Sequence, residues 1–474
     1  MNHQPNYPAK KIQKKKSQLQ VFKENQLPMI IACFAAILIL FFTIGSVVTA
    51  IKRAIINREA QITAAQQAEQ EQQQLQDKSA LLLAQATEAA SHFDYDSAIQ
   101  ILDGFTGDIT NFPQLAQAKE TYEDAKEDLI AWNDPAKIPN FSFQHLIADT
   151  RRAFSSEEYS QLFNKNFITT QEFTDILTQL YSNNYILVGI NDVYTVEDDG
   201  TGSMVCKAKT LYLPAGKKPI MITQTNVNFN YYLIDSDEDK LPDKDGCGFA
   251  SKLVIQDNHP LCEMVNRTGE TVTGAYDLIP ILDSFVETHP DFSYKGAKAV
   301  IALTGYNGLL GYRTTAEDKT RLGEDAYQAE VAQATEVANW LKNNGYTLAC
   351  YTYANIACGD AEIQSVQLDM DMWQKEVKPI LGTLDTFVFA QRSDISGSGA
   401  YSGLKFDLLS RQGFRYYIGF AESGTPWNYI SEGYIRQGRI MVSGATLSHQ
   451  SQWYNGMFDA QAILDSSRGT IPQW

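Results

Sequence analysis

The stretch KKPIMITQTNVNFNYY, residues 217–232, decides the fold class because an apolar strand runs directly into a polar strand end. Residues 219–222 form an apolar run of the kind that predicts a buried strand. Residues 223–228, TQTNVN, follow without a break and contain no charged residue. Ligands of barrel and open-sheet α/β folds bind at the carboxyl ends of the strands. The stretch therefore predicts a site rich in hydrogen-bonding groups but without a charged side chain.

Strands and helices alternate around this stretch. Thr169 and Glu172 form a capping box that predicts a helix over TQEFTDILTQLYS, and the strand YILVGI follows at 185–190. Further strands are predicted at 219–224, 252–256, 299–303, 346–350, 386–390 and 415–420, and a helix is predicted at 325–343. Repeated strand-then-helix order predicts a parallel α/β architecture, and periodicity alone does not distinguish a barrel from an open sheet.

The charge of the chain is unevenly spread over its 474 residues. Residues 1–28 hold six lysines against Glu24, and Lys52, Arg53 and Arg58 add three positive charges. Removing these +5 and +3 charges from the total of −17 leaves −25 on residues 59–474. So acidic a body repels nucleic acid and other polyanions unless a local basic groove or bound cations intervene. No nucleic-acid partner is therefore expected.

The segment from Met29 to Ile51 is uncharged over 23 residues and predicts a transmembrane helix. As a helix it spans roughly 34 Å, which is enough to cross a bilayer. The basic tail at 1–28 predicts a cytoplasmic N-terminus, which places the rest of the chain outside the cell membrane. A signal peptide cleaved near Val47–Ala50 is the alternative, but the long basic lead and the length of the apolar run favour an uncleaved anchor.

Four further parts are predicted after the anchor. Residues 52–78 are rich in Gln, Ala and Glu and read as a helical stalk or linker, and residues 79–132 resemble a tetratricopeptide helical hairpin. Such a hairpin buries little apolar surface by itself, so it is expected to pack on the neighbouring part of the chain or on a surface protein partner. The break NDPAKIPN at 133–140 predicts a linker, and the α/β domain is expected at 141–474.

The cysteines leave two alternatives open. Cys33 lies in the apolar segment, which leaves five cysteines, an odd number, for the remainder. The spacings of Cys247 with Cys262 and of Cys350 with Cys358 permit two disulfide loops in an oxidising exterior. Plain buried thiols are the equally weighted alternative.

The order of several motifs carries a family resemblance over roughly residues 140–470. These motifs are PAGKKPIMITQTNVNFNYY, GFASKLV, VETHPDFSYKGAKAVIALTGYNGLLGYRT, ACYTYANI and MWQKEVKPILGTLDTFVFA. The chain resembles the NodB-homology polysaccharide deacetylases (carbohydrate esterase family 4), especially the large membrane-anchored Gram-positive type. The resemblance implies a distorted (β/α) barrel whose strand ends hold a divalent metal, and the removal of acetyl groups from a surface glycan.

The family's site residues are replaced in this chain. The tandem aspartates of the family fall on Thr225 and Asn226, and its pair of metal-binding histidines falls on Tyr351 and Asn355. A threonine hydroxyl does not act as a general base near neutral pH, and asparagine and tyrosine bind divalent cations poorly. The resemblance therefore predicts a catalytically inactive deacetylase-like protein without a metal at this site.

Three functions are compatible with this pattern. The first is a non-catalytic domain that binds cell-wall glycan or scaffolds surface partners. The second is an active metal-dependent deacetylase, a hydrolase of non-peptide C–N bonds. Its site would be unorthodox, with Asp360, Asp371 or Asp394 in place of the acids that are missing at the family positions. Aromatic and polar side chains near strand ends are the candidates for a surviving glycan groove. These candidates are Asn226, Asn228, Tyr231, Tyr351, Tyr353, Gln391, Arg392 and Trp427.

The third function is calcium-dependent surface adhesion, which depends on the segment DSDEDKLPDKDGCG at 235–248. Calcium binds six to eight oxygens, and carboxylates at alternate loop positions supply them. The segment departs from the usual loop because Lys240 stands where glycine is usual and Gly246 stands at position twelve. A solvated acidic loop is the alternative. The calcium candidates are Asp235, Asp237, Asp239, Asp243 and Asp245.

Overall fold

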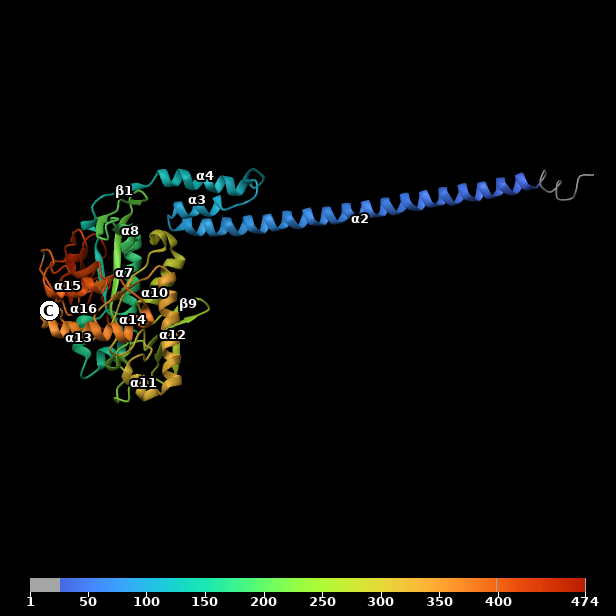
Figure 1. Ribbon diagram of the computed structural model, residues 1–474. Helices are drawn as coiled ribbons and strands as arrows, with labels where there is room; N and C mark the ends of the chain where they lie inside the picture. The colour runs from blue at the N-terminus through green and yellow to red at the C-terminus, as the bar shows by residue number, and fades with distance from the viewer. Residues whose placement is uncertain (1–25, 398, 474) are drawn as a thin grey trace, which may run out of the picture. The chain divides into compact units, whose positions relative to one another are not determined.

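The computed structural model describes residues 26–397 and 399–473 (Figure 1). The chain divides into two compact units, with the division between Leu81 and Leu82. The predicted linker at 133–140 thus falls inside the second unit rather than at its edge.

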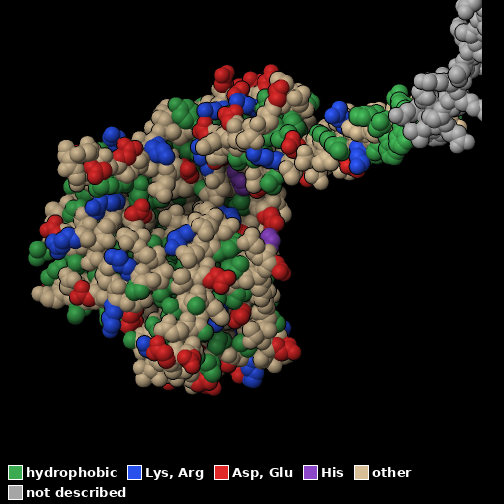
Figure 2. Space-filling model, turned by 45° about the vertical axis from the view of Figure 1, so that its right-hand side comes forward, with side chains coloured by type: hydrophobic (Ala, Val, Ile, Leu, Met, Phe, Trp, Pro, Cys, Tyr) green, Lys and Arg blue, Asp and Glu red, His purple; other side chains and the backbone are tan. Residues whose placement is uncertain are grey.

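The first unit consists, in its described part, of helix α2 (Leu27–Ser91), whose last turns belong to the second unit. The helix is continuous through the predicted membrane segment at 29–51 and the predicted stalk at 52–78. It is long and apolar enough to cross a membrane, and the apolar window is fully exposed to solvent. Hydrophobic side chains cover this stretch of the helix in Figure 2. Lys10, Lys11, Lys14, Lys15, Lys16, Lys23 and Glu24 lie outside the described residues, so the orientation stays a prediction.

The second unit begins with a small helical cluster. Helices α3 (Tyr95–Asp103) and α4 (Pro113–Glu127) pack beside the last turns of α2 (Figure 1). Ala86, Ala98 and Leu102 are fully buried between them. The likeness of this cluster to a tetratricopeptide unit stays a prediction. Ile130–Trp132, predicted as the end of the hairpin, instead forms strand β1, which pairs antiparallel with β6 (Leu211–Leu213).

Seven parallel strands form a closed barrel in the second unit. They are β2 (Asn140–Phe143), β7 (Lys218–Val227), β11 (Val300–Leu303), β12 (Thr347–Cys350), β13 (Thr386–Val388), β14 (Tyr416–Phe420) and β16 (Ile435–Met441). Their spatial order is β11-β12-β13-β14-β16-β2-β7, and the pairing of β7 with β11 closes the ring. Of the two architectures left open by periodicity, the barrel is thus the one that forms. Strand β3 (Tyr185–Leu187) pairs with the first residues of β7.

Burial on both faces explains the apolar runs of β11, β12 and β14. Small residues such as Ala302, Ala349 and Ala390 pack in a cluster inside the barrel. Residues that alternate with them, such as Ile301 and Leu348, pack outward in the main core. The helices that contribute to this core are α7 (Thr170–Ser182), α10 (Leu278–Thr288), α12 (Glu324–Asn343), α13 (Ile363–Met372), α14 (Lys378–Leu381), α15 (Leu404–Arg411) and α16 (Gly444–His449). The predicted capping box of Thr169 and Glu172 starts α7.

Two features of the fold differ from the sequence-based expectation. The predicted strand at 252–256 is β8 (Lys252–Gln256), but it lies outside the barrel in an antiparallel sheet with β9 (His259–Val265) and β10 (Thr271–Gly274). All six cysteines are free thiols, so the predicted pairs Cys247–Cys262 and Cys350–Cys358 do not form. Shorter elements between these are α8 (Ile190–Val193), α9 (Tyr231–Ile234), α11 (Ala316–Leu322), β4 (Tyr194–Asp198), β5 (Met204–Ala208) and β15 (Asn428–Ile430).

Candidate functional site

The carboxyl ends of the barrel strands form a mouth whose backbone is unusually strained. Asn226 after the body of β7 has φ 57°, and Asn355 after β12 has φ 55°. Thr352, Gln391 and Arg392 on the neighbouring exits also have positive φ. Asparagine tolerates this left-handed region better than other non-glycine residues, and such strain gathers at functional sites. Asn226 and Asn355, two of the four positions to which the resemblance assigns site residues, are therefore held in a left-handed conformation.

The hydroxyl of Tyr306, at the exit of β11, brings several of the predicted residues together. It accepts a hydrogen bond of 2.5 Å from Nδ2 of Asn230. The amides of Asn228 and Asn226 also face it, although only the Asn230 contact has full hydrogen-bond geometry. Burial raises the pKa of Tyr306, and these amides partly offset the rise, while Tyr351 lies close enough to add to it. The phenol therefore stays protonated and neutral at physiological pH.

Most of the buried side-chain polar atoms that lack a hydrogen-bond partner in the described part of the chain lie at this mouth. They are Oδ1 of Asn226, both amide atoms of Asn228, Oγ1 of Thr304, Oδ1 of Asn307 and Oδ1 of Asn355. Buried polar groups without partners cost free energy and are few in folded proteins. Every one of these atoms belongs to a neutral side chain, so this cluster of atoms offers hydrogen-bonding capacity without charge.

Thr225, at the position to which the resemblance assigns the first aspartate, links two strands of the barrel. Its hydroxyl donates a 3.1 Å hydrogen bond to the main-chain oxygen of Phe143 on β2, and the side chain is buried. The hydroxyl is thus committed to an inter-strand contact. It has neither the pKa nor the freedom of a general base.

A buried cation lies inside the barrel just below the mouth. The guanidinium of Arg439 on β16 donates to the main-chain oxygens of Phe389, Ile418 and Gly419 at 2.6–3.2 Å. Its central carbon is 5.8 Å from the centre of the Tyr351 ring and 3.9 Å from that of Phe420. Burial lowers the pKa of Arg439, but arginine starts so high that it stays charged. Tyr351, at a predicted histidine position, therefore packs beside a permanent positive charge.

The carboxylates around the mouth are engaged in holding loops. Asp369 accepts hydrogen bonds from the main-chain N–H groups of Tyr353 and Ala354 at 2.6 and 2.8 Å. Burial raises the pKa of Asp369, and these two hydrogen bonds partly offset the rise. Glu376 accepts from the Tyr353 hydroxyl at 2.7 Å. Both acids thus fix the segment that follows β12.

The three aspartates considered for an unorthodox active site are also committed. Asp394 accepts from Arg436 at 3.0 Å and from the Tyr401 hydroxyl at 2.9 Å, and burial raises its pKa. Asp360 accepts from the hydroxyl of Ser393 at 2.7 Å. Asp371 accepts from Gln367 on the exposed side of α13. None of these hydrogen bonds leads to Thr225, Asn226, Tyr351 or Asn355.

His145 and Asp277 form a second polar cluster outside the barrel, at the exit of β2. Nδ1 of His145 lies 2.6 Å from Oδ2 of Asp277, and Nε2 accepts from the main-chain N–H of Phe229 at 3.3 Å. Gln224 donates to both carboxylate oxygens of Asp277. Since both ring nitrogens have partners and the pair is buried, this histidine fixes the exit of β7 and offers no open ligand position.

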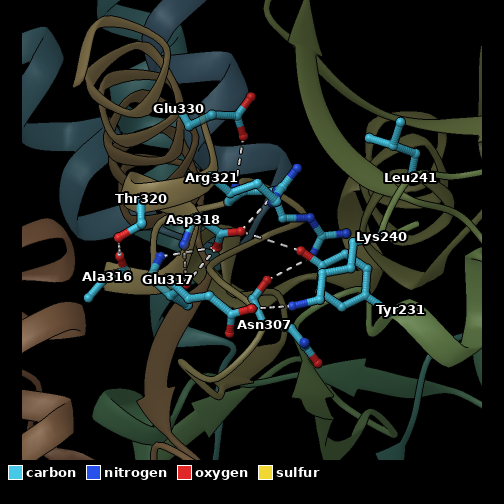
Figure 3. A network of polar contacts seen from close by, with 12 residues as sticks. Tyr231, Lys240, Leu241, Asn307, Ala316, Glu317, Asp318, Thr320, Arg321 and Glu330 are labelled. Carbon is cyan, nitrogen blue, oxygen red and sulfur yellow. Dashed lines mark hydrogen bonds and ion pairs between the residues drawn. The ribbon is translucent and has the colours of Figure 1, made fainter. Parts of the chain in front are cut away.

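Tyr231, predicted as a ligand-binding residue, instead anchors a network beside the mouth (Figure 3). The Arg313 guanidinium stacks 4.0 Å from the centre of its ring, and the ammonium of Lys240 lies 5.7 Å from it. Arg313 also donates to the main-chain oxygens of Asn307 and Phe229. The stack therefore ties the segments that follow β7 and β11 together.

The aromatic rim of the mouth adjoins a cavity of about 500 Å³. Its lining includes the rings of Phe420 and Trp427 and the charged side chains of Arg392, Asp394, Glu422 and Arg436. Trp427 is fixed by a 3.0 Å hydrogen bond from its indole N–H to the main-chain oxygen of Phe420. Gln391 and Arg392 are exposed at its edge. An open cavity lined by aromatic rings and polar groups suits a carbohydrate ring.

The acidic segment at 235–245 gathers only part of the predicted calcium set. The carboxylates of Asp235, Asp237 and Asp239 lie within 4.8 Å of one another. Asp243 accepts instead from the N–H and the hydroxyl of Ser236, and Asp245 pairs with Lys244. The predicted five-carboxylate site is thus reduced to three, and calcium at this segment stays a prediction.

Several residues of the mouth were not among the sequence-based candidates. Thr304, Tyr306 and Asn307 lie within GYNGLLGYRT and its preceding threonine, a stretch singled out only for its resemblance. Arg439 was missed because β16 was not predicted. His449 on α16 lies 3.0 Å from the main-chain oxygen of Ile471 and is not part of the mouth.

Comparisons with known proteins add little to this geometry. No family model matches the chain, and no curated protein matches it. Among solved structures, the chain is similar to a Streptococcus pyogenes deacetylase, PplD, in complex with acetate. The identity is 11%, the match covers 65% of this chain and 93% of the deacetylase, and the TM-score is 0.32. A likeness this distant carries no conclusion, so function is argued from the mouth itself.

Proposed function

We propose that residues 82–474 form a non-catalytic, glycan-binding domain of the NodB-deacetylase type, held at the cell surface by α2. The observation that carries the proposal is the cluster of unpartnered neutral groups on Asn226, Asn228, Thr304, Asn307 and Asn355. Hydroxyl and acetamido groups of a neutral sugar supply the donors and acceptors that this cluster lacks. The family resemblance of the motifs points to the same class of ligand.

Catalysis is disfavoured by the donor set at the mouth. The five residues that follow each of β7, β11, β12 and β13 include no aspartate, glutamate or histidine. His145 after β2 is held by Asp277, and Glu422 after β14 lies 3.9 Å from Arg392. A hydrolytic metal needs such ligands, and a bound water needs a base within hydrogen-bonding reach. The guanidinium of Arg439 near Tyr351 further opposes a divalent ion there. An active deacetylase with an unorthodox site is the weaker alternative, since Asp360, Asp371 and Asp394 are bound elsewhere.

The surface location rests on α2 and on the basic residues before it. An apolar helix of this length suits an uncleaved anchor, and the lysines of the tail favour a cytoplasmic N-terminus. The barrel then faces the cell wall, where acetylated glycans are abundant ligands. A surface protein bound through the α3–α4 cluster is the alternative partner.

The proposal is tested by two substitutions that keep the left-handed backbone. In Asn355→Gly the amide is lost while the φ of 55° remains accessible, and Asn184→Gly makes the same change at an exposed left-handed asparagine (φ 62°) before β3. Calorimetric titration of the full chain in detergent with N-acetylglucosamine tetramer is the measurement. Asn355→Gly should weaken binding about tenfold, as expected for the loss of one buried hydrogen bond, and Asn184→Gly should not. Equal affinities for both variants, or no binding by the unmodified chain, would refute the proposal.

A further inference from the structure

A second cavity of about 250 Å³ lies at the opposite end of the barrel from the mouth. On one side it is lined by the helical cluster, through Phe93, Tyr95 and Lys126. On the other side it is lined by residues 209–212 and by Tyr294 and Lys295. These residues precede β7 and β11 in the chain, so the cavity lies at the amino-terminal face of the barrel.

The walls of this cavity are joined by a defined set of contacts. The N–H of Lys295 donates to the main-chain oxygen of His92 at 2.8 Å, and Nδ1 of His92 lies 3.1 Å from the main-chain oxygen of Ser293. Phe93 and Lys295, on opposite walls, have φ of 59° and 53°. A bulky residue rarely adopts this conformation, and such strain persists where the surroundings fix it. The cavity is therefore built in advance of any ligand.

Lysine side chains give the cavity a local positive character within an acidic domain. Lys126 pairs with Asp96 at 2.6 Å, and Lys295 lies 3.6 Å from both Asp94 and Asp96. The ammonium of Lys209 instead donates to the main-chain oxygen of Asn191 at 2.8 Å. Lys209 thus donates to a neutral acceptor, and Asp192 is the acid of the wall that interacts with its charge.

Asp192, the other acid in the wall, interacts with the charge of Lys209 but makes no ion pair with it in the part of the chain that the structure describes. Its carboxylate accepts a 2.7 Å hydrogen bond from the N–H of Gly189. Burial raises the pKa of Asp192, and the Gly189 hydrogen bond and Lys209 partly offset the rise. The acid is thus held by α8, and the ammonium of Lys209 is left to face an incoming anion.

Aromatic rings supply the apolar part of the wall. Phe93 and Tyr95 meet edge to face with their centres 6.4 Å apart, and the ammonium of Lys295 lies 5.5 Å from the centre of the Tyr294 ring. Tyr212, on the β1–β6 ribbon, is 51% exposed at the rim and offers an uncovered ring face. Planar ligands stack on such faces.

We propose that this cavity, formed by Phe93, Tyr95, Tyr212 and Tyr294 together with Lys209 and Lys295, binds a small carboxylate carried on a single ring. Since a water occupies about 30 Å³ of liquid volume, about 250 Å³ accommodates one substituted ring and little more. The carboxylate pairs with the ammonium of Lys209, and the ring lies against the aromatic wall. An aromatic acid and a sugar acid share this chemistry.

The test uses the full chain in detergent and benzoate as the probe, with benzamide as its uncharged counterpart. Saturation-transfer NMR titrations should show benzoate binding and at least about tenfold weaker binding of benzamide. Lys209→Gln should weaken benzoate binding by a similar factor, whereas Lys207→Gln, at an exposed lysine on the neighbouring strand β5, should leave it unchanged. Glucuronate compared with glucose distinguishes a sugar acid from an aromatic acid as the preferred source of the carboxylate.

Several outcomes would overturn the proposal. They are equal binding of benzoate and benzamide, equal effects of Lys209→Gln and Lys207→Gln, and no binding of either acid. Tyr212→Ser provides a second variant at an exposed position and should weaken both benzoate and benzamide. None of these substitutions touches the mouth, so binding of N-acetylglucosamine tetramer should be unaffected by all three, and the two proposals fail independently.

Discussion

The guanidinium of Arg439 lies 2.6 Å from the main-chain oxygen of Phe389, so a buried positive charge spans from β16 to the end of β13. The same guanidinium is 5.8 Å from the ring of Tyr351, one of the positions where the resembling family has a metal-binding histidine. A divalent ion about 6 Å from this charge would be repelled by on the order of 5 kcal/mol at an effective dielectric constant of about 20. The barrel interior thus holds a cation of its own beside Tyr351, and this charge disfavours a divalent ion there.

Substitution of Arg439 tests this structural role. Arg439→Met keeps the approximate length of the side chain but leaves the oxygens of Phe389 and Gly419 without their charged donor. The free energy of unfolding should fall by about 2–4 kcal/mol, because hydrogen bonds to charged groups are stronger than neutral ones. Arg439→Lys retains the charge and should lower the free energy of unfolding by less than Arg439→Met. Urea unfolding of both variants is the measurement, and an equal loss for the two would show that the charge is unimportant.

The buried Asp369 predicts a specific pH dependence. Burial raises its pKa above that of the unfolded chain, so the folded state holds the proton more tightly. The proton on Asp369 therefore adds to the free energy of unfolding. This stabilisation is fully present below the pKa of the unfolded chain and is lost as the pH rises through the raised pKa of the folded state. The variant Asp369→Asn has no titratable group at this position. Its free energy of unfolding should be lower by about 1–3 kcal/mol, because the main-chain N–H of either Tyr353 or Ala354 loses its acceptor.

The difference in melting temperature between the unmodified chain and Asp369→Asn should therefore be largest near pH 4 and should narrow as the pH increases. Thermal unfolding followed by circular dichroism from pH 4 to pH 8 measures it. A difference that widens with pH would mean that the folded environment favours the charged carboxylate, contrary to the burial argument.

Calcium at the acidic segment has its own test. The carboxylates of Asp235, Asp237 and Asp239 are close enough to share one cation, whereas Asp245 pairs with Lys244. Millimolar calcium should raise the melting temperature of the unmodified chain, because a ligand that binds only the folded state stabilises it. Asp237→Ala should abolish the increase and Asp245→Ala should preserve it. If the melting curve does not change on addition of a chelator, the segment at 235–245 does not bind calcium and is an ordinary acidic loop.

Membrane topology is tested on intact cells. With the N-terminus in the cytoplasm, added protease should degrade the barrel and spare a tag placed before Met1. Loss of the tag under the same conditions would mean the reverse orientation. Recovery of a secreted form that begins near residue 51 would mean that the anchor is cleaved.

Much of the fold was predictable because burial on both faces leaves apolar runs that survive in the sequence. The strands at 299–303, 346–350 and 415–420 correspond to β11, β12 and β14. Strand β16 was missed because Arg436 and Arg439 interrupt its apolar pattern. Their partners are main-chain oxygens, Asp394 and aromatic rings that the folded barrel brings together. Strand β8 was predicted correctly as a strand but was assigned to the parallel sheet. The local sequence pattern does not show which strands it pairs with, and its partner β9 is antiparallel.

The candidate site was predictable in its chemistry but not in its geometry. The lack of charge after β7 was evident from TQTNVN, whereas the central position of Tyr306 depends on the closure of β7 against β11. Tyr231 and Tyr353 were named for their aromatic rings, but the stack with Arg313 and the hydrogen bond to Glu376 engage them in the structure. Local sequence does not reveal which aromatic residue already has a partner.

The central claim, that the mouth binds acetylated glycan without cleaving it, is tested most directly by one NMR experiment. The full chain is incubated with N-acetylglucosamine tetramer and with zinc, cobalt or nickel, and the acetyl methyl signals are followed over time. We predict saturation transfer to the bound acetyl methyl groups and no free acetate with any metal. Release of acetate that requires a metal and stops on addition of a chelator would contradict it and would establish an active deacetylase.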